Sequence, residues 1–431
     1  MSSARGESLA RSRRHSRSRA RPRVGAEIQR WTVGASFGGF PMSNVVVLEL
    51  GAAIAFVIIA VAPSLWPLAA LVVLGALAVG CTRWRGRWLP QWTGLLVRFL
   101  CRSRGRVAAP VAARTELSRD ATRDLTGPED ARVALLRLLV EDLVVASSTD
   151  HEQQPVGLSW HRGAWTAALA IDPVPVMVSP VGAHTDVPLA ALAHCLRDRG
   201  VVLDSIGVIW HCYPGSSRLP ADSPAVAAYN EVLGPLPAVA QRSTWVTVRL
   251  DPSRCPDAVH ERGGGVAGAH RALLGALSRV QGALDAAGLN SRVLSTDELL
   301  RAAVSCAELA AEVGQSARVE LNERWGGVRS GGVAHAGYSI SNWPLETGRL
   351  DALTSIRALS TTVALALSTG TEHDNVGLRG LVRVSARTAE ELATAEGRLT
   401  ALTAGSGIRV FRLNGQHAQA VASTLPVGGA A

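Results

Sequence analysis

Three glycines form the sequence pattern with the clearest chemical meaning in this chain, that of a phosphate-binding loop. Gly263, Gly265 and Gly268 have the G-x-G-x-x-G spacing with which a backbone can approach a pyrophosphate at the start of a helix. A dinucleotide site also needs a strand that ends directly before the first glycine and an acidic residue for the ribose. Here the preceding strand is expected to end near Leu250, and no such acid follows at the required distance. We therefore interpret the run as a flexible helix start, with a candidate phosphate loop as the alternative.

Histidine, cysteine and acidic residues form no metal-binding pattern in the sequence. Neither His260-Glu261 nor His151-Glu152 is followed by the second histidine of a zinc protease, and no D-x-D motif occurs. The six cysteines include no C-x-x-C pair, which is typical of proteins in a reducing compartment. His194-Cys195 and His211-Cys212 are interpreted as buried cysteines beside polar loop edges, because adjacent residues on a strand point to opposite faces. The sequence therefore predicts no metal site.

The remaining composition excludes several kinds of enzyme chemistry. All 44 basic residues are arginine, since the sequence contains no lysine. A P-loop lysine, a pyridoxal Schiff base and the ATP-binding lysine of protein kinases are therefore excluded. Glu372-His373-Asp374 is a charged cluster in a glycine-rich loop without a nearby nucleophile, which favours a solvated loop, with a partner contact as the alternative. We expect no catalytic residues, no cofactor and no enzyme activity.

The elements that must carry the function begin with two apolar stretches, at about residues 45–62 and 65–81. Each is close to the roughly 20 residues that a helix needs to cross a bilayer. Only a turn with Pro63 and Pro67 separates them. They predict a transmembrane hairpin over residues 43–82 in the plasma (inner) membrane. Arginines flank the hairpin on both outer sides and are missing from the turn, so we expect two spans with both termini cytoplasmic.

The flanks of the hairpin predict contact with anionic membrane lipids. The arginine-rich tail, residues 1–42, is expected to be disordered, and the hairpin holds its positive charge beside the lipid headgroups. For this reason no nucleic acid partner is expected. Tryptophan and arginine favour the membrane interface, and the residues expected there are Trp66, Arg83, Trp84, Arg85, Arg87, Trp88 and Trp92.

Four residues are candidates for contact with a partner protein. Glu49 is a carboxylate near the cytoplasmic end of the first span, where it either reaches the headgroups or makes a specific contact in a complex. Gly75, with Ala55 and Ala78, offers places for close helix packing. Trp325 and Trp343 flank a glycine-rich region and are either interface anchors or core tryptophans.

The rest of the sequence predicts a mixed α/β cytosolic domain in two lobes. An amphipathic juxtamembrane segment and linker occupy residues 83–114, and the two lobes occupy residues 115–236 and 237–431. The capping boxes Ser295-x-x-Glu298 and Thr388-x-x-Glu391 mark two helix starts. Helices are expected at 126–144, 186–200, 268–287, 295–313 and 388–405, and strands at 156–160, 165–171, 201–210, 244–250, 361–368, 381–385 and 408–413. This alternation is typical of an α/β or α+β fold.

Several stretches, considered together, resemble a known family. They are residues 83–87 after the hairpin, 248–252 with 255–258, the segment 262–265 (Arg-Gly-Gly-Gly), the strand 380–385 and the C-terminal stretch 425–429. Their order and spacing, together with the hairpin, are similar to those of EccE, a membrane component of the actinobacterial type VII (ESX) secretion machinery.

The resemblance implies a non-enzymatic structural subunit. Such a subunit sits at the edge of a secretion complex with the subunits EccB, EccC and EccD, and its domain hangs in the cytosol. The family supplies no catalytic residues. A membrane-tethered glycosyltransferase-like or nucleotide-sugar-binding protein with a degenerate site is the alternative, although the metal-binding D-x-D motif of sugar transferases is absent.

Overall fold

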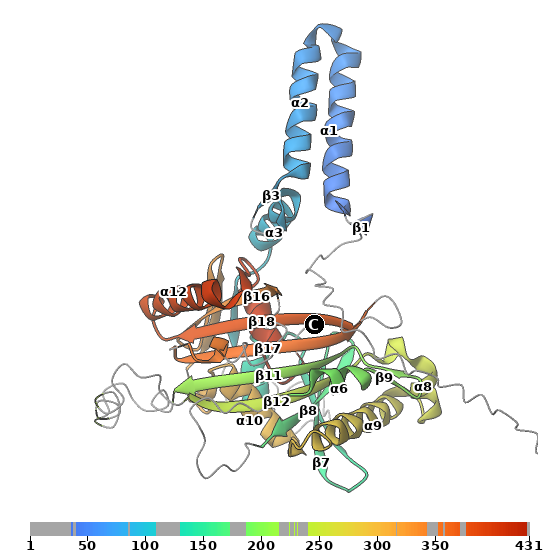
Figure 1. Cartoon of the computed structure of the whole chain (residues 1–431), viewed down its shortest axis with the longest axis vertical. Helices are drawn as coiled ribbons and strands as arrows, with labels where there is room; N and C mark the ends of the chain where they lie inside the picture. The colour runs from blue at the N-terminus through green and yellow to red at the C-terminus, as the bar shows by residue number, and fades with distance from the viewer. Residues whose placement is uncertain are drawn as a thin grey trace, which may run out of the picture.

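The chain consists of a long helical hairpin and an α/β domain at one end of it (Figure 1). The computed structural model describes residues 36–37, 40–84, 87–108, 130–172, 187–214, 240–315, 317–342, 352–356, 358–370 and 376–428, with isolated residues at 224, 228 and 231. Four of the sequence-based predictions lie wholly or mostly outside this part of the chain: the tail before residue 36, Arg85, Trp343 and the charged cluster at 372–374.

The hairpin is formed by α1 (Met42–Val61) and α2 (Trp66–Cys81), joined by the short 3-10 helix η1 (Pro63–Leu65). Both helices are long and apolar enough to cross a membrane, and most of their side chains are exposed. The two predicted helices are therefore confirmed to within a few residues. Two-residue strand pairs lie at the base, β1 (Ser36–Phe37) with β2 (Phe40–Pro41) and β3 (Arg83–Trp84) with β4 (Arg87–Trp88).

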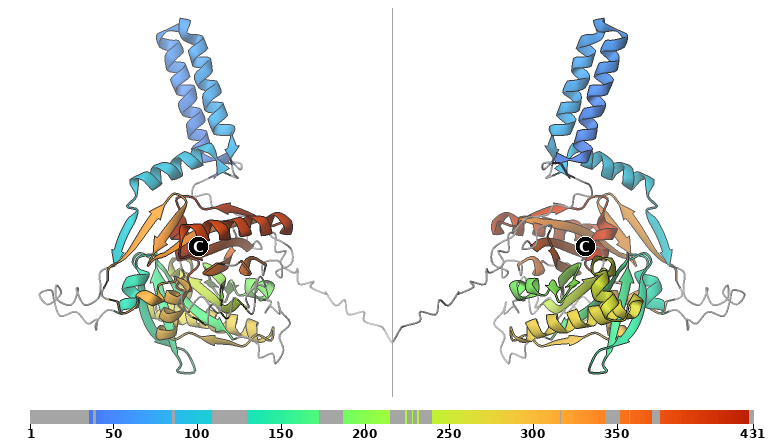
Figure 2. Two further views of the ribbon diagram at one scale, coloured as in Figure 1. Left: turned by 90° about the vertical axis from the view of Figure 1, so that its left-hand side faces the viewer. Right: turned by 90° about the vertical axis from the view of Figure 1, so that its right-hand side faces the viewer.

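Helix α3 (Leu89–Cys101) connects the hairpin to the α/β domain. It runs across the base of the hairpin, above the domain, in both side views (Figure 2). Pro90 occupies its first turn, where a missing N–H costs nothing. The next element, β5 (Gly105–Ala108), joins the sheet of the domain, so the connection between the two parts is short.

One large antiparallel sheet organises the domain. Its 13 strands follow the order β5-β14-β15-β16-β18-β17-β11-β12-β8-β7-β6, with β13 paired to β8 and β19 to β16. The bounds are β6 (Val144–Thr149), β7 (Pro155–His161), β8 (Ala164–Ile171), β11 (Ser205–Pro214), β12 (Ala240–Leu250), β13 (Ser291–Val293), β14 (Val319–Arg324), β15 (Gly327–Ser330), β16 (Val333–Asn342), β17 (Ser360–Thr369), β18 (Val376–Ala386) and β19 (Arg409–Arg412). A separate pair joins β9 (Arg197–Asp198) to β10 (Val201–Val202). Strands from both predicted lobes enter this sheet, and the division into lobes stays a prediction.

Helices cover both faces of the sheet and form two cores. The first face carries α6 (Leu189–His194), α8 (Pro256–Glu261), α9 (Gly265–Asp285) and α12 (Ala389–Ser406), and the second carries α5 (Ala131–Leu136), α10 (Thr296–Cys306) and α13 (His417–Ser423). Strand β8 shows the alternation that produces two cores: Ala167 and Leu169 face the first, whereas Ala168 and Ala170 face the second. Short 3-10 helices, η4 (Pro252–Arg254) and η5 (Ala310–Glu312), complete the described elements.

Three of the predicted helices end earlier than expected. The helix expected at 186–200 ends at His194, where the chain turns into β9, and the helix expected at 295–313 ends at Cys306. The helix expected to run through Val144 ends at Leu136, and Val144 begins β6 instead. Asp142 between them has a φ of 57°, a left-handed conformation that a helix cannot contain. The glycine-rich region 326–337 forms a strand hairpin. Gly331 and Gly332, with φ of 54° and 79°, form the two-residue turn between β15 and β16.

Candidate functional site

Small residues and one buried amide hold the two helices of the hairpin together. Gly51 faces Ala76 so closely that a Cβ on Gly51 would collide with the alanine side chain, and Gly80 contacts Leu48. Asn44 is fully buried, and its Nδ2 donates a hydrogen bond of 2.9 Å to the Gly80 carbonyl oxygen. Close backbone approach and a polar contact of this kind are typical of helix pairs in membranes. We call this contact surface between α1 and α2 the seam. The sequence alone did not identify it, although an asparagine directly before an apolar run is a usable signal.

The outer surface of the hairpin carries both predicted contact residues of the spans. A Cβ on Gly75 would meet no atom within 4 Å, so this glycine faces away from α1. Glu49 is likewise exposed on α1, and of the small residues named with Gly75, Ala78 is exposed and Ala55 is buried in the seam. Gly75 and Glu49 are therefore placed where a neighbouring helix could reach them. Contact with a partner stays a prediction.

Aromatic residues lie at both ends of the hairpin, as expected for a membrane interface. Trp66 is 65% exposed at the turn. At the base, the Arg83 guanidinium lies 5.6 Å from the centre of the Trp88 ring. The side chains of Trp84 and Arg87 lie outside the described part of the structure. These positions agree with an interfacial role, which remains a prediction for each of the seven residues.

Trp325 is the aromatic centre of the junction between α3 and the α/β domain. Its ring lies 5.4 Å from that of Phe99 in an edge-on arrangement and 6.1 Å from that of Trp92. Gly415, with a φ of 70°, passes so close that a Cβ there would lie 2.8 Å from the Trp325 ring. One of the predicted partner-contact residues therefore packs against α3 of its own chain. Trp92 joins this junction as well.

A buried carboxylate supplies the polar part of the same junction. The side chain of Glu323, 2% exposed, forms an ion pair with Arg102, which follows α3. The carboxylate also accepts a hydrogen bond of 3.0 Å from the Ala418 N–H in the first turn of α13. The Glu323 N–H donates to the Arg104 carbonyl oxygen at 2.9 Å. One residue of β14 thus holds the end of α3 and the start of α13 at once, which ties α3 to the sheet.

The glycine run at 263–268 makes a tight turn between α8 and α9. Gly263, Gly264 and Gly265 have φ of 105°, 69° and 54°, which glycine adopts without strain. The N–H groups of Gly263 and Gly264 donate at 3.0 Å to carbonyl oxygens of α8. Gly268 packs directly on the Val259 carbonyl and has no room for a Cβ. Packing therefore accounts for the glycines, and two of the amides that a phosphate would need are already used. Phosphate binding stays untested.

Cys195 and His211, one from each histidine–cysteine pair, lie on opposite faces of the sheet. Cys195 belongs to the core on the first face. His211 lies on the second face, where its Nδ1 is 2.9 Å from the Thr362 hydroxyl. In the described part of the chain, no group of three histidine, cysteine or acidic residues is placed to hold a metal ion.

Buried histidines on the second face are held neutral. Burial lowers the pKa of His417 to about 3, and its Nδ1 accepts a hydrogen bond of 3.1 Å from the Gly337 N–H. Burial, with the nearby charge of Arg383, also lowers the pKa of His335 well below the usual value. Neither histidine is accessible enough to act on a substrate, since both are fully buried.

Comparison with known proteins relates the chain to a secretion family. Residues 238–340 match the sequence model of the family described as "Putative type VII ESX secretion system translocon, EccE". A segment of 72 residues is 36% identical to "ESX-1 secretion system protein EccE1" of Mycolicibacterium smegmatis, covering 17% of this chain and 16% of the relative. A segment of 159 residues is 27% identical to the protein of the same name from Mycobacterium tuberculosis, covering 34% and 32%. The predicted relationship to EccE is confirmed.

The matches cover only part of each protein. This chain matches between 16% and 32% of the length of these relatives. The family match at 238–340 includes β12, the glycine run, α9, α10 and the strands β14 and β15, with Glu323 on β14 and Trp325 in the turn between the two strands. The hairpin and the stretches 380–385 and 425–429 lie outside it.

Proposed function

We propose that this chain, which is related to the EccE components of type VII (ESX) secretion systems, is a non-enzymatic structural subunit of a type VII secretion membrane complex. In this proposal the hairpin spans the plasma membrane with both termini in the cytoplasm. The α/β domain lies in the cytosol, at the periphery of the complex. Its partners are the EccB, EccC and EccD subunits and anionic lipids.

The observation that carries the proposal is the packing of α3, which follows the hairpin directly, on the α/β domain. A hairpin that served only as a lipid anchor would function on a flexible linker. Here α3 is packed on the domain through Trp325 and Phe99, and an ion pair with the buried Glu323 closes the same junction. A fixed junction transmits the position of the spans to the domain, which is the property that a scaffold subunit needs.

The outer face of the hairpin supports docking within the bilayer. Glu49 is exposed on α1, seven positions after Met42, so it lies about 10 Å along the helix axis from the start of α1. A charged side chain costs about 3 kcal/mol at the centre of a span, and less toward the end, where Glu49 lies, unless it is paired. Gly75, exposed on α2, leaves room for close approach of another helix. A neighbouring helix of the complex would satisfy both residues.

Copurification of the tagged chain from native membranes in mild detergent tests the proposal. We expect EccB, EccC and EccD of the same system to be recovered with it. Two matched hairpin variants separate folding from docking. Gly75→Leu adds bulk to the open face, so it should reduce recovery of partners while leaving the chain folded and in the membrane. Gly51→Leu should disrupt the seam itself, because its side chain would strike Ala76. Recovery of the chain without any other secretion subunit would contradict the proposal.

A further inference from the structure

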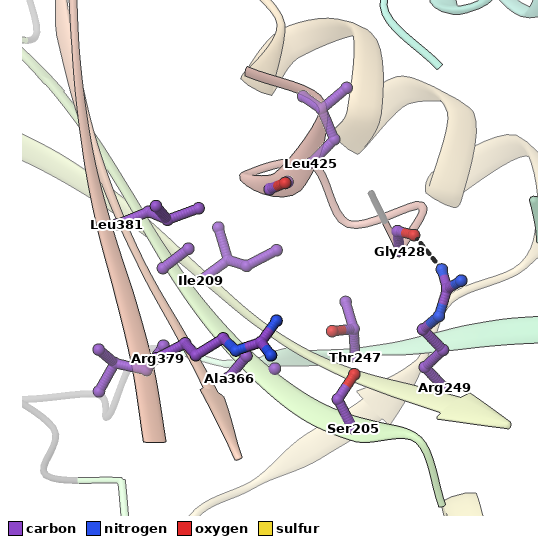
Figure 3. Close-up of a pocket in the computed structure, with 13 residues that line it drawn as sticks. Ser205, Ile209, Thr247, Arg249, Ala366, Arg379, Leu381, Leu425 and Gly428 are labelled. Carbon is purple, nitrogen blue, oxygen red and sulfur yellow. Dashed lines mark hydrogen bonds between the residues drawn. The ribbon is translucent and has the colours of Figure 1, made fainter. Parts of the chain in front are cut away.

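A pocket lies on the second face of the sheet, between strands β11, β12, β17 and β18 and the C-terminal segment that crosses them after α13 (Figure 3). Its cavity volume is about 50 Å³. A buried water needs about 10 to 15 Å³ of such volume, so this cavity holds a molecule of several non-hydrogen atoms. It is separate from the junction that Trp325 forms with α3.

The floor of the pocket is one row of side chains across four strands. In the register of the sheet, Gly207 pairs with Thr247 on one side and with Ala366 on the other, and Ala366 pairs with Arg379. The two small residues in the middle of the row leave the space. A Cβ on Gly207 would strike the Thr247 hydroxyl, so glycine is required there. The row thus places a hydroxyl at one end and a guanidinium at the other.

The roof of the pocket is a backbone segment held in place by buried polar groups. Arg249, 7% exposed, donates from Nη1 to the Gly428 carbonyl oxygen at 2.5 Å and from Nε to Asp204 at 2.9 Å. The Ser159 hydroxyl donates to the Val427 carbonyl oxygen at 3.0 Å. Fixed contacts of this kind keep the roof from collapsing onto the floor.

The lining has one polar side and one apolar side. The Arg379 guanidinium lies over Ala366 and points toward the Thr247 hydroxyl, with the Ser205 hydroxyl nearby (Figure 3). Leu381 and Leu425 form the opposite, apolar side. A guanidinium pairs with carboxylate or phosphate oxygens. Inorganic phosphate would leave oxygens against the leucines without hydrogen bonds, which is costly, whereas a carboxylate on a short alkyl chain matches both sides.

We propose that this pocket binds a small aliphatic carboxylate. Arg379 pairs with the carboxylate group, the Thr247 and Ser205 hydroxyls donate to it, and Leu381 and Leu425 contact the alkyl part. The ligand is either a free acid or the carboxylate end of a peptide. This site is independent of the proposed role in secretion.

Ligand-observed NMR on the full chain in detergent tests the site with four probes: isobutyrate, its neutral isostere isobutyramide, inorganic phosphate and N-acetylvaline. The acetylated amino acid represents a peptide end. We expect isobutyrate to bind with a dissociation constant on the order of 1 mM, typical of so few atoms. Isobutyramide and phosphate should bind at least tenfold more weakly. If N-acetylvaline binds more tightly than isobutyrate, the ligand is the carboxylate end of a peptide. If isobutyrate binds more tightly, the ligand is a free acid.

Two variants and a matched control identify the pocket as the place of binding. Arg379→Met removes the charge, and Ala366→Leu fills the cavity while keeping Arg379, so each should weaken isobutyrate binding at least tenfold. Arg329→Met, which changes an exposed arginine on β15, should leave binding unchanged. If Arg379→Met fails to fold, Ala366→Leu still shows whether binding occurs in this pocket, and the comparison with isobutyramide still shows whether binding needs the carboxylate. Equal binding of isobutyrate and isobutyramide, or unchanged binding in Ala366→Leu, would overturn the proposal.

Discussion

Replacing Trp325 by alanine is expected to loosen α3 from the α/β domain without unfolding the sheet. The ring centroids of Phe99 and Trp92 lie 5.4 Å and 6.1 Å from that of Trp325. An aromatic pair contributes about 1 kcal/mol beyond the area that it buries. Loss of both pairs lowers the free energy of opening the junction by about 2 kcal/mol. The open population should therefore rise about 30-fold, since each 1.4 kcal/mol is a factor of ten.

Limited trypsin digestion measures this opening directly. The chain has no lysine, and Arg102 and Arg104 lie where α3 meets the domain. Cleavage after either arginine separates the hairpin from the domain, and intact mass spectrometry follows both products. When reclosing is faster than cleavage, the rate is proportional to the open population. The Trp325→Ala protein should therefore be cut at these arginines about 30 times faster than the wild type.

A tryptophan outside the junction provides the control. Trp66, 65% exposed at the hairpin turn, has the same side chain but lies far from α3 along the hairpin, so Trp66→Ala should leave the cleavage rate unchanged. Equal rates for wild type and Trp325→Ala would refute the idea that aromatic packing closes the junction. A similar rise in the Trp66→Ala protein would show that the effect is not local.

Two further expectations concern the stability of the domain. The pKa of His417 is about 3 in the folded chain against about 6.5 in an unfolded one, so the unfolded state takes up the proton first as the pH falls. Stability is full above pH 6.5 and should decline by about 2 kcal/mol between pH 7 and pH 5, measured by denaturant unfolding. In His417→Asn, the amide oxygen can accept the hydrogen bond from the Gly337 N–H, so this part of the decline should vanish. An unchanged dependence of stability on pH would contradict the role given to His417. Gly268→Ala should lower the unfolding free energy by at least about 2 kcal/mol, because its Cβ meets the Val259 carbonyl. Gly275→Ala in the same helix, with open space around it, should raise that free energy by up to about 1 kcal/mol, and equal effects of the two substitutions would contradict the packing role of the glycine run.

Local signals made parts of the fold predictable from the sequence. The two apolar stretches gave the hairpin helices because length and hydropathy alone specify a span. The capping boxes marked α10 and α12 correctly: Ser295 Oγ accepts from the Glu298 N–H at 3.4 Å, and Thr388 Oγ1 accepts from the Glu391 N–H at 3.1 Å. Strands β14 to β16 were missed because their glycines and polar residues hide the alternation of a half-buried hairpin.

The junction could be predicted only in part, because its contacts join distant parts of the sequence. Trp325 was recognised as an anchor, but nothing local indicates that α3 is what it packs against. The alternation around Glu323 places that carboxylate on the buried side of β14, yet its partner Arg102 lies 221 residues before it and its partner Ala418 lies 95 residues after it. For the hairpin, composition could not decide that Gly51 faces the seam and Gly75 the outside, since that depends on the rotation of each helix.

The mass of the particle that the full-length chain forms in its native membrane tests the central claim most directly. The chain itself is 45.2 kDa. Light scattering on a mildly solubilised, size-fractionated sample, with the detergent mass subtracted, gives the protein mass without assuming any partner. We expect the chain in a particle several times heavier than one copy, with other secretion subunits in the same fraction. A homogeneous peak at the mass of a single chain, from membranes that contain all of those subunits, would contradict the account.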